Sequence, residues 1–200
     1  MFVLYLGFVG LLVFTLGAGI SGLWLRKNPS EVNAEKSGRI MHSIFLAGLV
    51  APFFISLVYP GIPQLDELVG LEPLPLKSFF LIIGIILAAP GLYFLGISGK
   101  LLRTQGNGVN AFRQTKQIVQ TDIYKRTRNP MSLGYYLWTL GLGFILASRL
   151  VTFVVLLGFI PAHVFFLKFF EELELELRFG EAYKQYKGKV PFLIPKFSTD

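Results

Sequence analysis

The chain has no cysteine and only two histidines in its 200 residues. Without cysteine it has no disulfide bond, no thiolate metal ligand and no cysteine nucleophile. His42 and His163 stand on distant segments with no carboxylate at ligand spacing, so the sequence favours packing histidines and predicts no metal site. Charge is scarce as well. Asp, Glu, Lys and Arg make up 16% of the residues, well below their share in ordinary soluble domains.

Apolar sequence takes the place of these residue types. Hydrophobic residues make up 53% of the chain, 20 residues are Phe, and the mean hydropathy is +0.59. A helix needs roughly 17 to 25 apolar residues to cross about 30 Å of hydrocarbon. Five uncharged runs approach that length, at residues 2–25, 40–59, 78–99, 131–148 and 150–167. The sequence therefore predicts a single compact all-α integral membrane domain with about five transmembrane helices.

Two alternatives concern the first and last runs. The first run could be a secretory signal peptide, but no Lys or Arg precedes it, and Leu23 to Leu25 are poor neighbours for a small-residue cleavage site. We interpret it as a membrane span. The last two runs could form one re-entrant unit, because Arg149 separates them and Pro161 interrupts the second.

Basic residues are placed unevenly between the runs. Seventeen of the nineteen lie in segments 26–39, 100–130 and 168–200. The acidic, proline-rich connection at 60–77 and the turn at 149 hold one each. By the positive-inside rule, this distribution predicts an external N-terminus and a cytosolic C-terminus. The net charge of +7 is then mainly topological, and basic residues without a recognition motif do not indicate a nucleic-acid partner.

Polar clusters flank the last two apolar spans, 131–148 and 150–170. Arg126, Arg128, Asn129 and Pro130 precede them, and Glu171 and Glu172 follow. If the spans form a hairpin that turns at Ser148 and Arg149, their outer ends return to one membrane face. The two clusters then meet in a charged pocket at that face. Because Asn129 and Pro130 are typical of a helix start, the free N–H groups there, together with Arg128, would bind a carboxylate.

The segment after Phe170 carries four glutamates within six residues. Its Leu and Glu alternation could be a strand, but Glu and Leu are strong helix formers, so we expect a helix to about Phe179 with a break at Gly180. For Glu174 and Glu176 we expect a solvated acidic face, with Glu174 and Arg178 at i,i+4. For Glu171 and Glu172, at the end of the span, we expect a salt bridge or a cationic ligand.

Two stretches together resemble a known family. They are GNGVNAFRQTKQIVQTDIYKRTRNPMSLG, which starts at Gly106, and EELELELRFGEAYKQYKGKVP, which starts at Glu171. They resemble the isoprenylcysteine carboxyl methyltransferase and phospholipid methyltransferase superfamily, whose patterns are a GxG, LVxxGxYxxxRHPxYxG, an apolar hairpin and EExxLxxxFGxxYxxYxxxVP. The resemblance covers about residues 100–195. It departs at Asp122, Asn129 and Ser132, where the family has Gly, His and Tyr, and at Leu167, where the carboxyl methyltransferase branch has a substrate-binding Arg.

The resemblance implies an integral membrane methyltransferase that binds S-adenosylmethionine from the cytosol. The apolar runs predict three N-terminal transmembrane helices in residues 1–99. The resemblance implies a methyltransferase core in 100–200, made of the GxG segment, the hairpin 131–170 and a cytosolic C-terminal helix. The implied cofactor-binding residues are Gly106, Gly108, Lys116, Gln117, Ile118, Val119, Tyr124, Asn129, Pro130, Met131, Ser132, Glu171 and Glu172. Catalytic roles fall to Arg128, Glu171 and Tyr124, and Lys168, beside Leu167, is the candidate substrate-binding residue.

The chemistry of the cofactor agrees with these residue types. Glu171 or Glu172 can offset its sulfonium and ammonium charges, Arg128 can hold its carboxylate, and Tyr124 can face the sulfonium. A pocket at this depth favours a lipophilic acceptor, such as an isoprenylcysteine-like carboxylate, a lipid or an apolar small molecule. Methylation of a small thiol or amine remains an alternative. A non-catalytic membrane protein that retains the fold is the third hypothesis.

Overall fold

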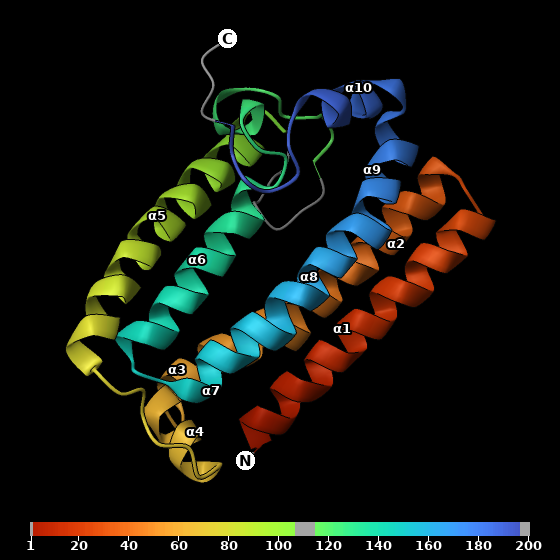
Figure 1. The fold of residues 1–200 in the computed structure, drawn as a ribbon. Helices are drawn as coiled ribbons and strands as arrows, with labels where there is room; N and C mark the ends of the chain where they lie inside the picture. Colours follow the sequence, from red (N-terminus) through yellow and green to blue (C-terminus); the bar gives the residue numbers. More distant parts are fainter. Residues whose placement is uncertain (1, 107–114, 197–200) are drawn as a thin grey trace.

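The computed structural model describes residues 2–106 and 115–196, and the regular structure in these ranges is entirely helical. Figure 1 shows long helices lying side by side, with α10 and the C-terminus at one end and α4 and the N-terminus at the other. The helices are α1 (Phe2–Lys27), α2 (Glu31–Phe45), η1 (Leu46–Val50), α3 (Ala51–Val58), α4 (Ile62–Leu68), α5 (Lys77–Thr104), η2 (Asp122–Lys125), α6 (Pro130–Ile145), α7 (Arg149–Phe153), η3 (Val154–Phe159), α8 (Ile160–Phe166), η4 (Leu167–Glu171), α9 (Glu172–Phe179) and α10 (Glu181–Lys189). The predicted all-α class is confirmed.

Four continuous rods in the described ranges are long and apolar enough to cross a membrane: 2–27, 31–58, 77–104 and 149–179. The remaining apolar helix, α6, has 16 residues and is about 24 Å long at 1.5 Å per residue. It lies between α5 and the 149–179 rod, and the predicted hairpin forms where Ser148 caps α7 by accepting a hydrogen bond from Val151 N at 3.1 Å. The apolar runs of the sequence thus correspond to five apolar helical rods.

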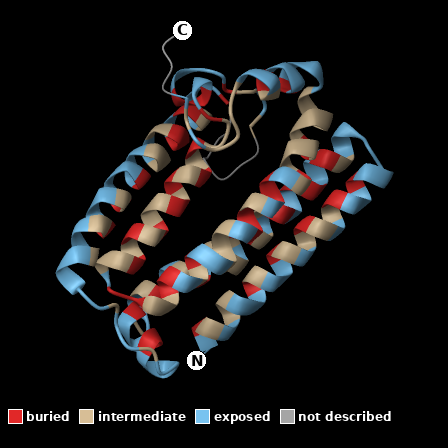
Figure 2. Ribbon diagram, viewed as in Figure 1, coloured by how far each residue is buried: buried red, intermediate tan, exposed pale blue. Residues whose placement is uncertain are grey.

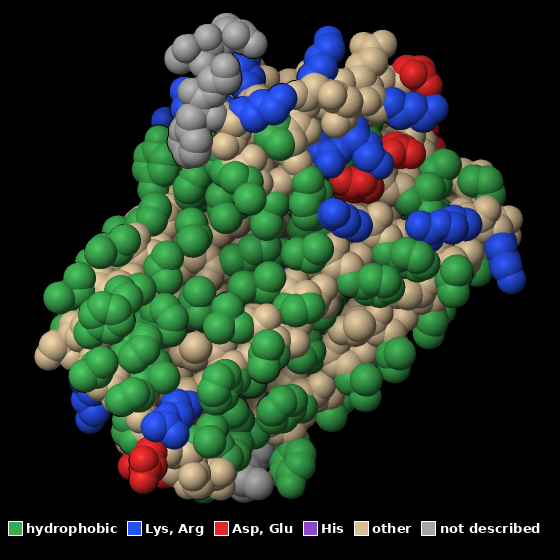
Figure 3. All heavy atoms as spheres, in the orientation of Figure 1, with side chains coloured by type: hydrophobic (Ala, Val, Ile, Leu, Met, Phe, Trp, Pro, Cys, Tyr) green, Lys and Arg blue, Asp and Glu red, His purple; other side chains and the backbone are tan. Residues whose placement is uncertain are grey.

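The outer surface of these rods is hydrocarbon. Large apolar side chains such as Phe8, Leu12, Ile82 and Ile86 are more than half exposed, and only 22% of the apolar window of α1 is buried inside the protein. Figure 2 shows that exposed residues run along the outer sides of α1 and α5, and Figure 3 shows green apolar side chains over the flanks and most basic side chains near the α10 end. Such a surface suits a lipid environment.

Glycine lets α5 and α6 approach closely. A Cβ at Gly91 of α5 would lie 2.5 Å from the backbone nitrogen of Trp138, and one at Gly141 of α6 would lie 2.7 Å from the carbonyl oxygen of Gly84. Neither distance is compatible with a side chain, so the two backbones are in direct contact. Small residues permit this kind of helix packing in lipid, where hydrophobicity alone does not bring helices together.

Two rods widen into π-helix next to their prolines. The segment η1 precedes Pro52, and η3 ends just before Pro161. Proline donates no backbone hydrogen bond and clashes with the carbonyl four residues earlier, and a widened turn relieves that clash. A third π segment, η4, contains no proline and ends at Glu171. Isolated π turns of this kind are frequent at functional sites.

The packing of α1, α2, α8 and α9 supports the end of the hairpin. Phe14, Met41, Phe166 and Phe170 form a core between these helices, and each is at most 9% exposed. Arg26 at the end of α1 donates from Nη2 to the carbonyl oxygen of Phe169 at 3.0 Å, and Phe169 lies within η4, next to the core residue Phe170. At the opposite end, Asp66 of α4 accepts from Leu150 N at 2.8 Å, so the acidic 60–77 connection caps α7.

Candidate functional site

A cavity of about 240 Å³ lies near the α10 end of the bundle, where α2, η2, the start of α6, η4 and α9 meet. Its charged and polar lining includes Arg128, Glu171, Glu174, Arg178, His42 and His163. Its apolar lining includes Phe45, Met131, Tyr135, Phe166, Leu167 and Phe170. The two polar clusters that flank the hairpin in the sequence therefore meet at one cavity.

Arg128 is the principal cation of one wall. Its Nη2 lies 3.0 Å from Glu172 Oε1, and the two side chains are 10% and 13% exposed. Its Nε and Nη1 are buried and have no hydrogen-bond partner in the described part of the chain. A buried guanidinium normally uses all of its donors, so these two nitrogens are available to an anionic ligand in the cavity.

Glu172 and Lys187 continue the charge network away from the cavity. Lys187 Nζ lies 2.7 Å from Glu172 Oε2 and 2.8 Å from Glu176 Oε1. Burial lowers the pKa of Lys187, but the hydrogen bonds that it donates to Glu172 and Glu176 outweigh this effect and leave that pKa above its ordinary value. Glu172 thus has two cationic partners within the protein. It does not line the cavity.

Glu171 differs from its neighbour. It lines the cavity from the end of η4, and among the described residues it forms no ion pair. The alternative that we expected for this pair, a salt bridge or a cationic ligand, therefore divides between the two residues: Glu172 forms the salt bridge, and Glu171 has no cationic partner in the described chain.

Glu174 corrects one expectation. It is 3% exposed and lines the cavity, with Oε1 2.8 Å from Arg178 Nη1, so the prediction of a solvated acidic face is wrong for this residue. The i,i+4 pairing itself is confirmed. Arg178 also donates to the carbonyl oxygen of Thr115, which holds the start of the 115–121 segment against α9. The turn of α9 places Glu174 one helical turn beyond Glu171, on the same inward face.

The chain after α10 holds the other wall in place, which the sequence did not predict. Arg128 N donates to Pro191 O at 2.9 Å, and Asn129 Nδ2 donates to Phe192 O at 2.9 Å. Thr127, fully buried, donates from Oγ1 to Leu193 O at 2.9 Å. Asn129 occupies the cap position of α6 as expected, but its side chain is used on Phe192 and does not cap the helix.

Three buried tyrosines close the α10 side. Tyr186 donates from its hydroxyl to the carbonyl oxygen of Tyr124 at 2.8 Å, and both line the cavity with Tyr183. Burial raises the pKa of Tyr124 and of Tyr186 well above the ordinary tyrosine value. Burial also raises the pKa of Tyr183, and the nearby carboxylates Glu171 and Glu172 add to that increase. These phenols stay neutral near pH 7, so Tyr124 presents an uncharged ring and not a base.

Both histidines line the same cavity, although they come from distant spans. His163 Nδ1 lies 2.8 Å from the Tyr136 hydroxyl, and the imidazole packs among Phe45, Phe159 and Phe166. His42 Nε2 is buried without a partner in the described chain. No group of three or more His, Cys, Asp or Glu side chains in residues 2–106 and 115–196 could hold a metal ion.

The remaining sequence candidates divide by position. Those that line the cavity are Ile118, Val119, Tyr124, Asn129, Pro130, Met131, Ser132 and Glu171. Lys116 and Gln117 are exposed beside it, Gly106 is buried and accepts from Lys116 N at 2.8 Å, and Lys168 is exposed with Nζ 4.8 Å from the ring centre of Phe192. Gly108 lies outside the described residues.

Two departures from the family pattern have a structural reading. Asp122 has φ +52°, a left-handed conformation that glycine adopts freely and that aspartate tolerates better than most residues. The backbone shape that a glycine would favour is therefore kept. Leu167 is 2% exposed and lines the cavity. An apolar side chain therefore occupies the position where the carboxyl methyltransferase branch has a substrate-binding arginine.

Comparison with known families matches residues 79–182 to the phospholipid methyltransferase family. The match begins within α5 and includes α6, the hairpin, η4 and α9, and it ends at the start of α10. Comparisons with curated proteins and with solved structures found no match. Because the matched residues cover more than half of the chain and include both walls of the cavity, the protein belongs to the phospholipid methyltransferase family.

Proposed function

We propose that this membrane methyltransferase transfers a methyl group from S-adenosylmethionine to a lipophilic acceptor at the 240 Å³ cavity. One observation carries the proposal. Arg128, with two nitrogens that have no hydrogen-bond partner, and Glu171, which forms no ion pair, line a single cavity within the described structure. Unsatisfied buried charges of opposite sign are costly unless a ligand completes them. The ligand should therefore carry both an anion and a cation.

S-adenosylmethionine fits that requirement. It has a carboxylate, which Arg128 can bind through Nε and Nη1, and an ammonium and a sulfonium, which Glu171 can offset. The neutral ring of Tyr124 can pack against the sulfonium. Asn129, Met131 and Ser132 lie on the same wall and can line the rest of the molecule. When bound, S-adenosylmethionine supplies an activated methyl group for an in-line displacement.

The chain contributes alignment and exclusion of water more than acid or base chemistry. Methyl transfer reduces charge separation at the reacting centre, so holding the two reactants in line in a dry cavity should supply most of the acceleration. A carboxylate acceptor needs no base. An amine acceptor must lose a proton, and among the described lining residues Glu171 is the carboxylate free of an internal cation.

The acceptor is lipophilic in this proposal because much of the cavity lining is apolar. Met131, Phe166, Leu167 and Phe170 all line the cavity. Leu167 in place of a basic residue disfavours an acceptor that depends on its own carboxylate for binding. The distribution of Lys and Arg supports a cytosolic location for the cavity end of the bundle, where the cofactor is synthesised and available.

The test uses the purified protein in detergent, S-adenosylmethionine labelled in its methyl group and a total lipid extract of the source organism. We expect label in an organic-extractable product, and we expect Glu171→Gln to reduce its formation at least tenfold while Glu181→Gln, an exposed carboxylate on α10, has no effect. Label found only in a water-soluble thiol or amine would favour the small-acceptor alternative. No transfer to any fraction, with no saturable binding of the cofactor, would contradict the proposal.

A further inference from the structure

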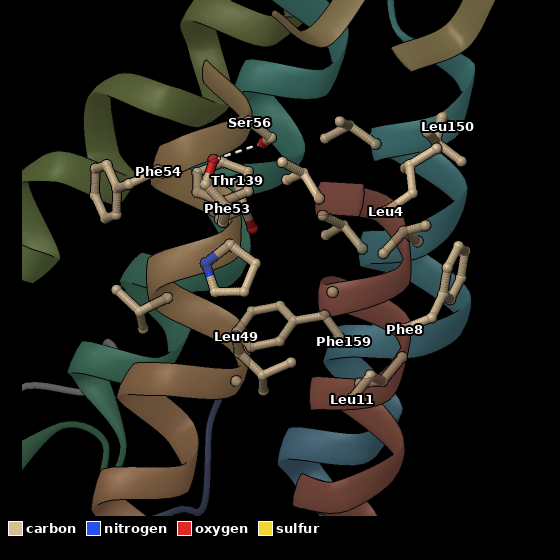
Figure 4. Close-up of a pocket in the computed structure, with 18 of the residues that line it drawn as sticks. Leu4, Phe8, Leu11, Leu49, Phe53, Phe54, Ser56, Thr139, Leu150 and Phe159 are labelled. Atoms are coloured by element: carbon tan, nitrogen blue, oxygen red, sulfur yellow. Dashed lines mark hydrogen bonds between the residues drawn. The ribbon is translucent and has the colours of Figure 1, made fainter. Parts of the chain in front are cut away.

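A second cavity, of about 150 Å³, lies on the α4 side of the first. Figure 4 shows its lining, which comes from Leu4, Phe8 and Leu11 of α1, Leu49 and Phe53 of the η1–α3 segment, and Leu150 and Phe159 of the α7–η3 segment. Nothing in the proposed cofactor site uses these residues. The cavity is therefore a second space in the membrane-spanning part of the protein, and it is partly open, since Phe8 and Phe54 of its lining are about half exposed.

The lining of this second cavity is almost entirely apolar. Two of its hydroxyls are satisfied within their own helix: Ser56 Oγ donates to Phe53 O at 2.6 Å, and Thr139 Oγ1 donates to Tyr135 O at 2.7 Å. A polar occupant would lose its hydrogen bonds to water and regain few of them here. The chemistry of the lining therefore selects a hydrocarbon chain.

The two cavities share aromatic lining residues. Phe45 and Tyr135 line both, and their ring centres are 6.0 Å apart with the planes inclined at 72°. Phe159 of the second cavity lies 5.5 Å, centre to centre, from His163 of the first. Aromatic rings are thus common to the walls of a charged chamber and an apolar one. A molecule with a polar head and an aliphatic tail could occupy both if its chain passed between Phe45 and Tyr135.

We infer that the second cavity holds the aliphatic tail of the methyl acceptor while its reacting head group lies in the first. The inference rests on the proposed function and adds to it a tail-binding subsite and two specificity-determining residues, Phe45 and Tyr135. A tail that fills the second cavity should bind most tightly, because close packing, and not removal from water, distinguishes the cavity from the surrounding lipid. Longer or branched tails should then bind less well.

The glycines of the spans provide a matched pair of variants. Gly7 lines the second cavity, and a Cβ there would meet no heavy atom within 4 Å, so Gly7→Leu fills the cavity without a backbone clash. Gly96 of α5 also has no heavy atom within 4 Å of a Cβ and lines neither cavity, so Gly96→Leu is the control. Leu4→Trp narrows the same cavity from another position and covers the case in which Gly7→Leu does not fold.

The experiment has two readouts on these variants. One is methyl transfer from labelled S-adenosylmethionine to the total lipid extract. The other is photolabelling in phosphatidylcholine nanodiscs that contain a phospholipid with a diazirine at the end of one acyl chain, with labelled residues mapped by mass spectrometry. Saturable cofactor binding reports that each variant is folded.

We expect the wild-type protein to be labelled at Leu11, Leu49 or Thr139, and Gly7→Leu to lose both this labelling and at least tenfold of the transfer. Gly96→Leu should retain both. Undiminished transfer by Gly7→Leu and Leu4→Trp, or a wild-type cavity that takes no label, would overturn the inference and leave the proposed function standing. If the wild-type cavity is labelled but the protein transfers no methyl group, the proposed function is overturned. The bound acyl tail could then not be assigned to a methyl acceptor.

Discussion

The guanidinium of Arg128 lies against the carboxylate of Glu172, with Nη2 3.0 Å from Oε1, across the two ends of the hairpin formed by α6 and the 149–179 rod. In this arrangement Nε and Nη1 of Arg128 have no partner in the described chain. Glu171, the residue before Glu172, has no cationic partner there either. The contact therefore does two things. It joins the ends of the hairpin, and it orients the donors that we assign to the cofactor.

If Glu172 orients Arg128, their effects on cofactor binding should be coupled. We expect Arg128→Ala and Glu172→Gln each to weaken S-adenosylmethionine binding, and the double variant to be little worse than Arg128→Ala alone. The coupling should be about 1 to 3 kcal/mol, as for other residues in one partly buried charge network. Isothermal titration of the four proteins measures it. Strictly additive losses would mean that Glu172 does not act through Arg128.

Arg178 should contribute to stability more than to chemistry. It binds buried Glu174 at 2.8 Å and the carbonyl oxygen of Thr115, so Arg178→Ala removes the arginine that neutralises a buried carboxylate and releases the 115–121 segment. We expect a loss of about 3 kcal/mol in the free energy of unfolding. Thermal unfolding in detergent measures the change. Lys184→Ala, which breaks the exposed pair with Glu181, is the control and should leave the midpoint unchanged.

The left-handed backbone at Asp122 predicts a stabilising substitution. With φ at +52°, Asp122→Gly should remove most of the steric cost of this conformation and raise the free energy of unfolding by about 1 kcal/mol. Asp122→Ala keeps a Cβ and loses the polar side chain, so it should be destabilising. Unfolding midpoints of the two variants give the answer, and equal midpoints would indicate that the backbone relaxes at this position.

The glycine contact between α5 and α6 should tolerate no methyl group. Gly141→Ala places a Cβ 2.7 Å from the Gly84 carbonyl oxygen, and separating the helices to accommodate it should cost about 1 to 3 kcal/mol. Gly96 lies on α5, as Gly84 does, but a Cβ at Gly96 would meet open space, so Gly96→Ala should have no destabilising effect. Comparing the thermal midpoints of these two variants distinguishes the cost of a clash between α5 and α6 from the effect of replacing any helical glycine by alanine. A tolerated Gly141→Ala would contradict the close approach.

Features set by local sequence were predictable. Run length located the apolar rods because hydrocarbon thickness fixes the length of a membrane helix, and Gly180, with φ +57°, ends α9 where a helix break was expected. The return of Arg128 and Glu172 to one end follows from the hairpin alone.

Features that depend on contacts between distant segments were not predictable. Glu174 looks like part of a solvated face in the sequence, and its burial follows from the approach of α2 and the 115–121 segment to α9. The use of Asn129 by Phe192, and the meeting of His42 with His163 at one cavity, likewise arise from tertiary packing. The pairing of Phe45 with Tyr135 has no local signal, because the sequence does not show which sides of α2 and α6 meet.

The measurement that tests the account most directly is the affinity of the purified wild-type protein and of Glu171→Gln for S-adenosylmethionine. Glu174→Gln would be a poor control, because Glu174 lines the same cavity and is paired with Arg178. The control that removes the same charge is Glu181→Gln, since Glu181 is exposed and lies outside the cavity. Loss of a charge-assisted contact of about 1.5 to 3 kcal/mol predicts an affinity at least tenfold lower for Glu171→Gln, and an unchanged affinity for Glu181→Gln. Equal affinities of wild type and Glu171→Gln, or no saturable binding by the wild type, would contradict the assignment of this cavity to the cofactor.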